Sequence, residues 1–335
     1  MSKIDIFNHI LPEGVYDELK RIAPNNVALR AFKGLPELWD MDRHFSLMDE
    51  FGDYQQILSL SNPPIEMLGS SEQTPKFAEI CNNALAVTCE RHPDRFPGFI
   101  ASLPMNNPDA VVREARRCIG DLGARGVQIF SNVLGAPLSE PCFYGLFEYM
   151  ASVDLPVWIH PMRGANHADY STEETSKNEI WFTFGWPYET SAAVTRLIFS
   201  GIFDKLPDLK IITHHGGGMI PFYSQKIALG FSQIFEGDPE RNPAAVEAGL
   251  RRPLIDYYRM LYADTALNGS AAATRCSHDF FGTGHMLFAT DAPFDARGGR
   301  QLVGSSIAAV EALPIDSSER ERIFSGNARA LLKLD

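Results

Sequence analysis

Eight short runs of β-branched and other apolar residues recur along the 335-residue chain, separated by longer stretches. We place strands at residues 3–8, 55–60, 98–103, 126–130, 155–160, 209–214, 260–264 and 285–290. The intervening stretches show helical spacing, as in Val194, Leu197 and Ile198. Strands that alternate with helices form parallel βαβ units, and eight such units can close into a barrel. The sequence therefore predicts an α/β fold, a (β/α)8 TIM barrel in which residues 1–335 form a single domain.

The predicted strands are unevenly spaced. Long segments separate the first strand from the second, residues 9–54, and the fifth from the sixth, residues 161–208. We therefore expect insertions after strands 1 and 5. The loops at the carboxyl ends of barrel strands build the active site, so these insertions are expected to cover the catalytic end.

Composition excludes several classes of protein. The net charge of −12, without a run of Lys or Arg, argues against a nucleic-acid surface. Five scattered cysteines without a CxxC pair indicate reduced thiols rather than a disulfide framework. No basic segment precedes a long apolar stretch at the N-terminus, and no apolar run approaches the roughly 20 residues of a membrane span. We expect a cytoplasmic protein that does not associate with membranes.

Four of the apolar runs end in residues that can carry chemistry. These residues are His9, His160, the pair His214 and His215, and Asp291. Strand ends meet at one mouth of a barrel, and imidazole nitrogens with a carboxylate oxygen suit a zinc-type ion. A single histidine at a strand end is more often a hydrogen-bonded scaffold residue. Four such ends favour a shared site.

Residues 214–218, HHGGG, follow the sixth predicted strand. The glycines allow a tight turn that brings backbone amides close to a bound group, although a plain strand-to-helix turn would also need them. A histidine directly before them can accept or donate a proton near neutral pH. Asp291, in the segment ATDAPFDARGG, can ligate a metal, orient a water molecule or cap the following turn.

Longer motifs extend over nearly the whole chain, among them IDIFNHILP, GARGVQIFSN, LPVWIHP, WPYETSAAVTRLIFSGIFDKLPDLKIITHHGGGMIPF, FATDAPF and SGNARALL. With these motifs the chain resembles the amidohydrolase superfamily, in particular its aminocarboxymuconate-semialdehyde decarboxylase-like branch. The resemblance implies a metal-dependent (β/α)8 barrel, often a homodimer, that cleaves C–C bonds by nonoxidative decarboxylation. Relatives hydrolyse lactones or hydrate double bonds.

Carried over to this chain, the resemblance implies that His9, His160 and Asp291 bind Zn²⁺ or Mn²⁺. It makes His215 the acid/base residue, and we assign Asp291 to catalysis as well as to metal binding. Asp264 is expected to line the substrate pocket. Strand alternation turns His214 away from His215, so we do not expect His214 to bind the ion.

Two positions depart from the pattern of the family. The first strand of relatives ends in His-x-His or Glu-x-His, but this chain has Phe7 at the first of these positions. Metal binding is therefore expected to be weak or absent, with Phe7 facing the substrate. His44 stands where the semialdehyde decarboxylase has an arginine. We assign His44, Arg163 and Trp186 to the binding of a small carboxylate substrate.

The leading hypothesis is a carboxy-lyase that decarboxylates an unsaturated or hydroxyaromatic acid. Two alternatives stay open. One is a hydrolase or hydratase, in which a metal-bound water attacks a lactone, ester or unsaturated acid. The other is a metal-free, degenerate barrel that binds a ligand without turnover, for which Phe7 is the main support.

Overall fold

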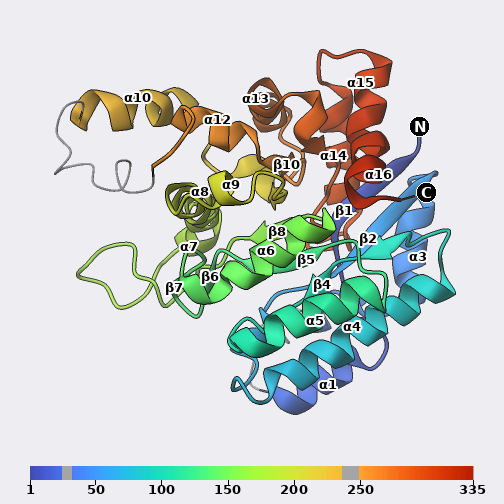
Figure 1. Ribbon diagram of the computed structural model, residues 1–335. Coiled ribbons are helices and arrows are strands. Elements are labelled where there is room, and N and C mark those ends of the chain that lie inside the picture. Colours follow the sequence, from blue (N-terminus) through green and yellow to red (C-terminus); the bar gives the residue numbers. More distant parts are fainter. Residues whose placement is uncertain (25–31, 236–248, 335) are drawn as a thin grey trace.

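The computed structural model describes residues 1–24, 32–235 and 249–334 (Figure 1). Its barrel strands are β1 (Lys3–Ile10), β2 (Tyr54–Leu60), β3 (Gly98–Phe99) with β4 (Ala101–Ser102), β5 (Val127–Phe130), β8 (Val157–His160), β9 (Ile211–Thr213), β10 (Tyr262–Asp264) and β11 (Met286–Leu287). Each of the eight predicted strands corresponds to one of these strands or, for residues 98–103, to the pair β3 and β4. Within the two sheets that make up the barrel, every pair of neighbouring strands is parallel.

Backbone hydrogen bonds close the barrel at two junctions. Ile100, between β3 and β4, donates to Leu58 of β2, which joins the two sheets on that side. On the other side Ile6 of β1 donates to the carbonyl of Phe288, just beyond β11, at 3.0 Å. The first strand therefore lies beside the last, and the TIM barrel predicted from the alternating pattern is confirmed.

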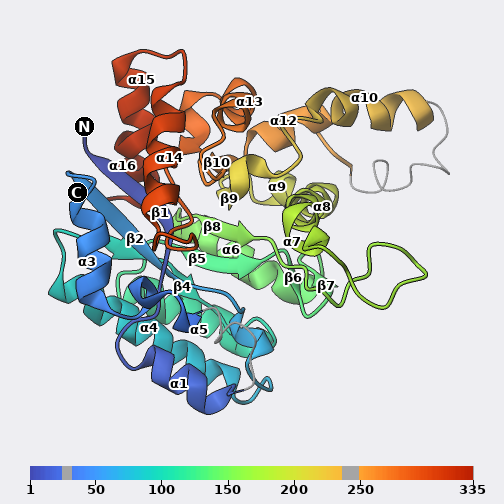
Figure 2. The ribbon, with the colours of Figure 1, turned by 180° about the vertical axis from the view of Figure 1, so that it is seen from behind.

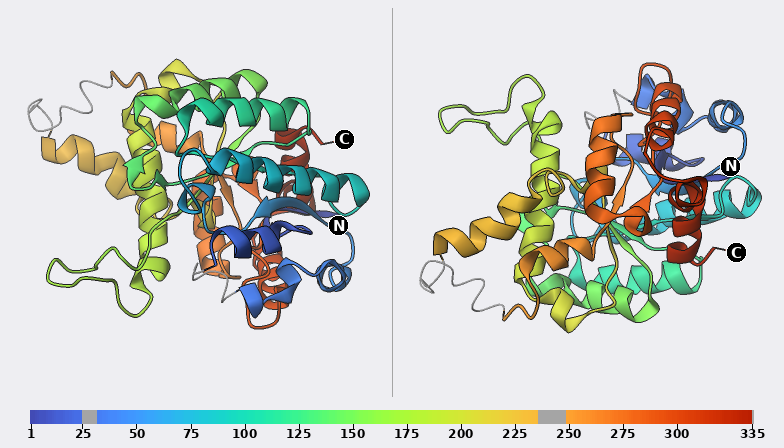
Figure 3. Two further views of the ribbon diagram at one scale, coloured as in Figure 1. Left: turned by 90° about the horizontal axis from the view of Figure 1, so that it is seen from below. Right: turned by 90° about the horizontal axis from the view of Figure 1, so that it is seen from above.

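Helices pack around the outside of the strands, as the views from below and from above show (Figure 3). The α-helices are α1 (Val15–Ile22), α3 (Met41–Asp49), α4 (Thr74–Arg91), α5 (Pro108–Gly120), α6 (Tyr144–Val153), α7 (Ile180–Thr183), α8 (Gly185–Phe199), α9 (Ile202–Lys205), α10 (Ser224–Phe235), α12 (Leu254–Arg259), α13 (Ala271–Phe281), α14 (Arg300–Glu311), α15 (Ser317–Glu321) and α16 (Asn327–Leu332). Short elements complete the chain: the 3₁₀ helices η1 (Pro36–Leu38), η2 (Ile65–Met67), η3 (Pro141–Phe143), η4 (His215–Gly217) and η5 (Thr283–His285), the π-helix η6 (Arg322–Gly326), and a hairpin of β6 (Asn132–Val133) and β7 (Ala136–Pro137).

Successive residues of the strands alternate between two hydrophobic clusters. Ile57, Trp158 and Ile212 belong to an inner cluster, whereas the residues beside them, such as Leu58 and Val157, pack in the larger cluster beneath the helices. This alternation follows from the two-residue period of a strand, which sends side chains to opposite faces. It also decides which strand-end side chains face the interior of the barrel.

Long connections follow β1 and β8, at residues 11–53 and 161–210, where the sequence predicts insertions. Residues 161–179 contain no helix or strand and extend away from the barrel (Figures 1 and 2). A third long connection, residues 214–261, follows β9 and includes α10, which the sequence did not predict as an insertion. Among the described residues, no helix is both long and apolar enough to cross a lipid bilayer.

Candidate active site

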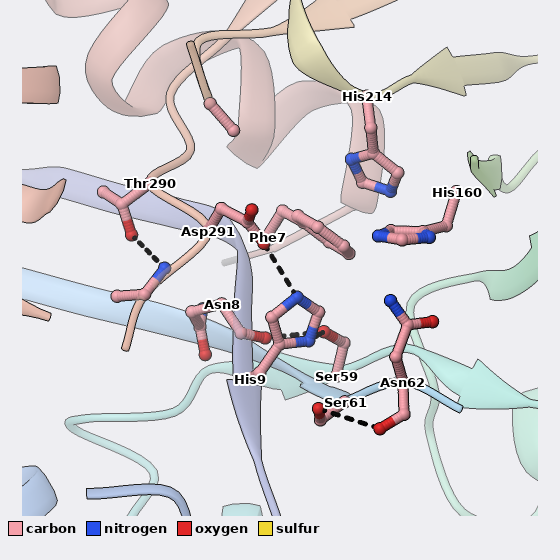
Figure 4. A network of polar contacts seen from close by, with 12 residues as sticks. Phe7, Asn8, His9, Ser59, Ser61, Asn62, His160, His214, Thr290 and Asp291 are labelled. Carbon is pink, nitrogen blue, oxygen red and sulfur yellow. Dashed lines mark hydrogen bonds and ion pairs between the residues drawn. The ribbon is translucent and has the colours of Figure 1, made fainter. Parts of the chain in front are cut away.

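Side chains from four strand ends, those of β1, β8, β9 and β11, gather at the carboxyl-terminal mouth of the barrel. We call them the mouth cluster: Phe7, His9, His160, His214, His215 and Asp291. Figure 4 labels all of them except His215. Rings within the cluster lie close together; the centroids of His160 and His215, for example, are 6.1 Å apart. The structure therefore brings together the strand-end residues that the sequence singled out.

His9 is fixed from both sides of its ring. Its Nδ1 lies 3.1 Å from the carbonyl oxygen of Leu60, and its Nε2 lies 3.0 Å from Oδ1 of Asp291. Phe7 lies two residues earlier and packs edge-on against His9, with ring centroids 4.5 Å apart. Both side chains face the mouth, as strand alternation predicts, although the pairing of β1 with β2 shifts register between Asp5 and Asn8.

His160 ends β8 in largely aromatic surroundings. Its Nδ1 donates to the carbonyl of the next residue, Pro161, at 2.7 Å, which leaves Nε2 unprotonated when the ring is neutral. Phe130 and Trp186 pack edge-on against the ring, each with centroids 5.1 Å from it. Burial lowers the pKa of His160 well below its ordinary value, and the nearby His214 lowers it further. His160 is therefore neutral near pH 7.

His214 and His215 both reach the mouth, which corrects the expectation that His214 points away. Ile212 faces the interior, so His214, two residues later, faces the interior as well. The chain then turns sharply: His215 has φ of 55° and Gly216 has φ of 62°. A Cβ at Gly216 would lie 2.5 Å from Oγ of Ser277, so only glycine fits this turn. The turn brings the second histidine back toward Asp291.

Asp291 lies between two imidazoles. Its Oδ2 is 3.6 Å from Nε2 of His215, and its Oδ1 faces His9. Burial would raise the pKa of Asp291, but the contacts with His215 and His9 hold it well below its ordinary value. For His215, burial alone would lower the pKa. The contact with Asp291 outweighs burial and raises the pKa of His215 above its ordinary value. Asp291 is therefore ionised and favours a proton on His215.

The backbones of His215 and Asp291 are both left-handed, with φ of 55° and 62°. This conformation costs a non-glycine residue roughly 1–3 kcal/mol and clusters at functional sites, although six other described non-glycine residues of this chain also adopt it. It appears here at the two residues to which the resemblance assigns catalysis.

Asp264 does not line the pocket as predicted. It is fully buried, and its Oδ2 accepts a 2.6 Å hydrogen bond from Nδ1 of His214. Its Oδ1 accepts from the backbone amides of Gly216 and Ala266. These contacts make Asp264 a support for His214 and for the glycine turn. Nε2 of His214 is buried without a hydrogen-bond partner, a feature that the sequence reasoning missed because it assigned the wrong face to this residue.

Two of the predicted substrate-binding residues have other partners. His44 lies on α3, where its Nδ1 donates to the carbonyl of Glu37 and its Nε2 lies 2.6 Å from Oε1 of Gln56. With both nitrogens bonded and 1% of its surface exposed, His44 is a scaffold residue. Arg163 forms an ion pair with Glu189 at 3.0 Å, so its charge is already neutralised.

Trp186, for which the sequence predicts a role in substrate binding, lies beside the mouth cluster. Its ring stacks over His215 with centroids 6.1 Å apart and an interplanar angle of 27°. Its indole nitrogen donates to the carbonyl of Arg163, which fixes the ring. Trp186 therefore forms one wall beside the candidate acid.

The arrangement does not fit the metal ion that the resemblance implies. His9, His160 and Asp291 offer suitable donor atoms, but the Phe7 ring lies among them, with its centroid 5.7 Å from that of His160. In the described ranges, no three His, Cys, Asp or Glu side chains are placed to hold an ion together. The three ligand roles stay predictions.

Comparisons with known proteins agree with this architecture. A family model described as amidohydrolase matches residues 4–334. The chain is 29% identical to a gamma-resorcylate decarboxylase of Rhizobium radiobacter over 301 residues, which cover 88% of this chain and 87% of that one. It is 28% identical to a 2-amino-3-carboxymuconate-6-semialdehyde decarboxylase of Dictyostelium discoideum, with 89% of this chain and 77% of that one covered.

A solved structure extends the likeness to three dimensions. The dihydroxybenzoic acid decarboxylase from Polaromonas sp. JS666, with bound manganese and the inhibitor 2-nitroresorcinol, superposes with a TM-score of 0.80. The two chains are 25% identical, and the match covers 99% of this chain and 97% of that one.

Proposed function

The chain belongs to the amidohydrolase family, and from that premise we propose that it removes CO2 from an aromatic or unsaturated carboxylic acid without oxidation. The observation that carries the proposal is the pair His215–Asp291. An ionised carboxylate beside an imidazole of raised pKa provides a proton donor at the barrel mouth.

In the proposed reaction His215 donates its proton to the carbon that bears the carboxylate. The bond from this carbon to the carboxyl group then breaks, and its electron pair stays with the substrate as CO2 leaves. The product carries hydrogen where the carboxylate was, and His215 regains a proton from solvent. Asp291 keeps His215 oriented and stabilises its positive charge throughout the cycle.

The aromatic side chains around the mouth favour the binding of a flat substrate. Trp186 and Phe130 flank His160, and Phe294 lies 5.3 Å from His9 between ring centroids. Aromatic faces prefer offset or edge-on contacts with other rings. Hydroxybenzoates, on which two of the compared relatives act by their names, are therefore the first substrate class to test.

The decisive assay incubates the purified protein with a panel of hydroxybenzoates in D2O and measures CO2 release and deuterium in the product. We expect deuterium at the carbon that lost CO2. His215→Ala should lower the rate by about 10²–10⁴-fold because it removes the proton donor. His285→Ala is the matched control, since His285 precedes β11 at the opposite end of that strand from Asp291 and contacts the carbonyl of Leu261.

The same assay separates the alternatives. With a lactone, ester or unsaturated acid as substrate, incorporation of ¹⁸O from labelled water into the acid or alcohol that is formed, without CO2 release, would instead indicate a hydrolase or hydratase. An unchanged rate in His215→Ala would refute the proton-donor role. Homodimerisation and a cytoplasmic location stay predictions, the first of which light scattering on a sizing column would test.

A further inference from the structure

Phe7 occupies the middle of the mouth cluster. Its side chain is fully buried, and its ring centroid lies 3.5 Å from that of His214 and 4.5 Å from that of His9 (Figure 4). Carbon atoms in contact are about 3.5–4.0 Å apart, so the ring fills the space between these two imidazoles. A phenyl ring offers no lone pair to a cation, unlike the histidine or glutamate of relatives.

Asp291 is also engaged by the chain itself. One carboxylate oxygen faces Nε2 of His9 at 3.0 Å, and the other faces Nε2 of His215 at 3.6 Å. A catalytic zinc site generally has three protein ligands at about 2.0–2.3 Å from the ion. Among the residues that the structure describes, no three candidate ligands meet in this way. The predicted ligands His9 and Asp291 instead contact each other directly, and the His160 ring lies 6.5 Å from that of His9 between centroids.

We infer that this barrel does not hold a divalent ion among His9, His160 and Asp291, and that the Phe7 ring keeps the ion out. The direct contact of His9 with Asp291 takes the place of the bonds that each would make to a metal. This inference does not depend on the proposed reaction, because metal content is measured without a substrate. The decarboxylase assay can therefore contradict the proposed function without contradicting this inference, and the metal analysis can contradict this inference without contradicting the proposed function.

The first test is the metal content of the wild-type protein. The full chain is expressed in medium supplemented with Mn²⁺ and Zn²⁺, purified without chelators and analysed by inductively coupled plasma mass spectrometry. We expect less than about 0.1 ion per chain, and no saturable heat when Mn²⁺ is titrated into the protein. About one ion per chain, retained through gel filtration, would overturn the inference.

The second test is a gain of binding in Phe7→His. An imidazole on the same face of β1 as His9 would add a nitrogen where the phenyl ring now stands. We expect the metal content to rise about 10-fold or more, to near one Mn²⁺ per chain, and the melting temperature to rise when Mn²⁺ is added. Loss of both gains after a further His160→Ala change would place the ion at the mouth.

Phe130→His is the matched control for Phe7→His. Phe130 also packs against His160 at the mouth, but it does not lie between His9 and His214. It should stay metal-free. A folded Phe7→His variant that stays metal-free, or an equal gain in both variants, would contradict the assignment to Phe7. If Phe7→His does not fold, the metal content of the wild-type protein alone decides.

Discussion

The mouth cluster and a second buried network contain the same kinds of residue but differ in how completely they are bonded. The second network, which we call the Asp5 network, lies where β1 and β2 meet α3 and consists of Asp5, His44, Tyr54, Gln56 and Thr290. Asp5 accepts from the hydroxyls of Tyr54 and Thr290 at 2.6 and 2.5 Å. In the mouth cluster, by contrast, Nε2 of His214 is buried without a partner.

This difference distinguishes residues that only hold the fold from residues that can still bind a ligand. Buried polar groups are nearly always hydrogen-bonded, so one without a partner requires an explanation. His44 has both ring nitrogens bonded within the chain and nothing left to offer a ligand. His214 is held by Asp264 on one side and presents a free nitrogen on the other. The predictions below test this contrast.

The largest expected effect is a loss of unfolding free energy when a residue of the mouth cluster is replaced. His214→Ala removes the imidazole donor to the fully buried Asp264 carboxylate and leaves a cavity, and together these changes should cost about 3–5 kcal/mol of unfolding free energy. Replacement of both partners, His214→Phe with Asp264→Leu, should recover only part of that loss in urea unfolding, because the amides of Gly216 and Ala266 then lack their acceptor. A loss below about 1 kcal/mol in the single variant would mean that the hydrogen bond of His214 to Asp264 contributes little to stability.

The next effect concerns a buried acid without partners. Both carboxyl oxygens of Glu66 lack hydrogen bonds, and burial raises its pKa from 4.5 to about 7. The folded chain therefore keeps this proton between pH 4.5 and about 7, where the unfolded chain loses it, so stability falls as pH rises through this window.

Glu66→Gln removes that titration. We expect the variant to be more stable than the wild type by about 3 kcal/mol at pH 8 and nearly equal to it at pH 4. Urea unfolding at both pH values measures the difference. Glu72→Gln is the matched control on the exposed surface nearby. An equal effect at both pH values would show that the pKa of Glu66 is the same in the folded and unfolded chains.

Tyr54→Phe tests the Asp5 network. It removes a hydroxyl that donates to Asp5 and accepts from Gln56 at 3.1 Å. Leaving these buried groups unpaired should cost about 1–3 kcal/mol of unfolding free energy, while kcat stays within about twofold because no catalytic contact is lost. A large fall in kcat with unchanged stability would reverse the assignment of scaffold and site.

The smallest expected effect is a shift in the pH profile. Because the pKa of His215 is raised, kcat should fall with rising pH only above the pH at which an ordinary histidine loses its proton. The charge of Asp264 contributes to that raised pKa. Asp264→Asn should therefore move the alkaline limb to lower pH, by less than about one unit. Asp169→Asn, in the loop after β8, should leave the limb unchanged.

The sequence predicted the barrel and the convergence of its strand ends because both follow from periodicity. A strand's two-residue period and the placement of sites at carboxyl ends suffice to bring His9, His160, His215 and Asp291 together. The same period would have placed His214 inside had it been counted from Ile212. The left-handed turn at His215 breaks the alternation, and its local signal is the run of three glycines that follows.

Other assignments depend on partners that a single segment cannot reveal. His44 is bonded to Gln56, on the next strand, and Arg163 pairs with Glu189 on α8. Each looked free in its own segment because its partner lies outside it. A relative of solved structure binds manganese. The substitution at Phe7 was visible in the sequence because it interrupts the family's pattern at the end of the first strand. The position of the Phe7 ring among the imidazoles was not visible there.

The closure of the barrel has a consequence for the order of events during synthesis. Ile6 pairs with Phe288, and His9 meets Asp291, 282 residues away in the chain. The first strand leaves the ribosome long before β11, beside which it lies, has been synthesised. A nascent chain without the final segment therefore lacks both the hydrogen bond of Ile6 to Phe288 that closes the barrel and the carboxylate of Asp291. We therefore expect catalytic competence to arise only when translation is nearly finished, and incomplete chains to be inactive.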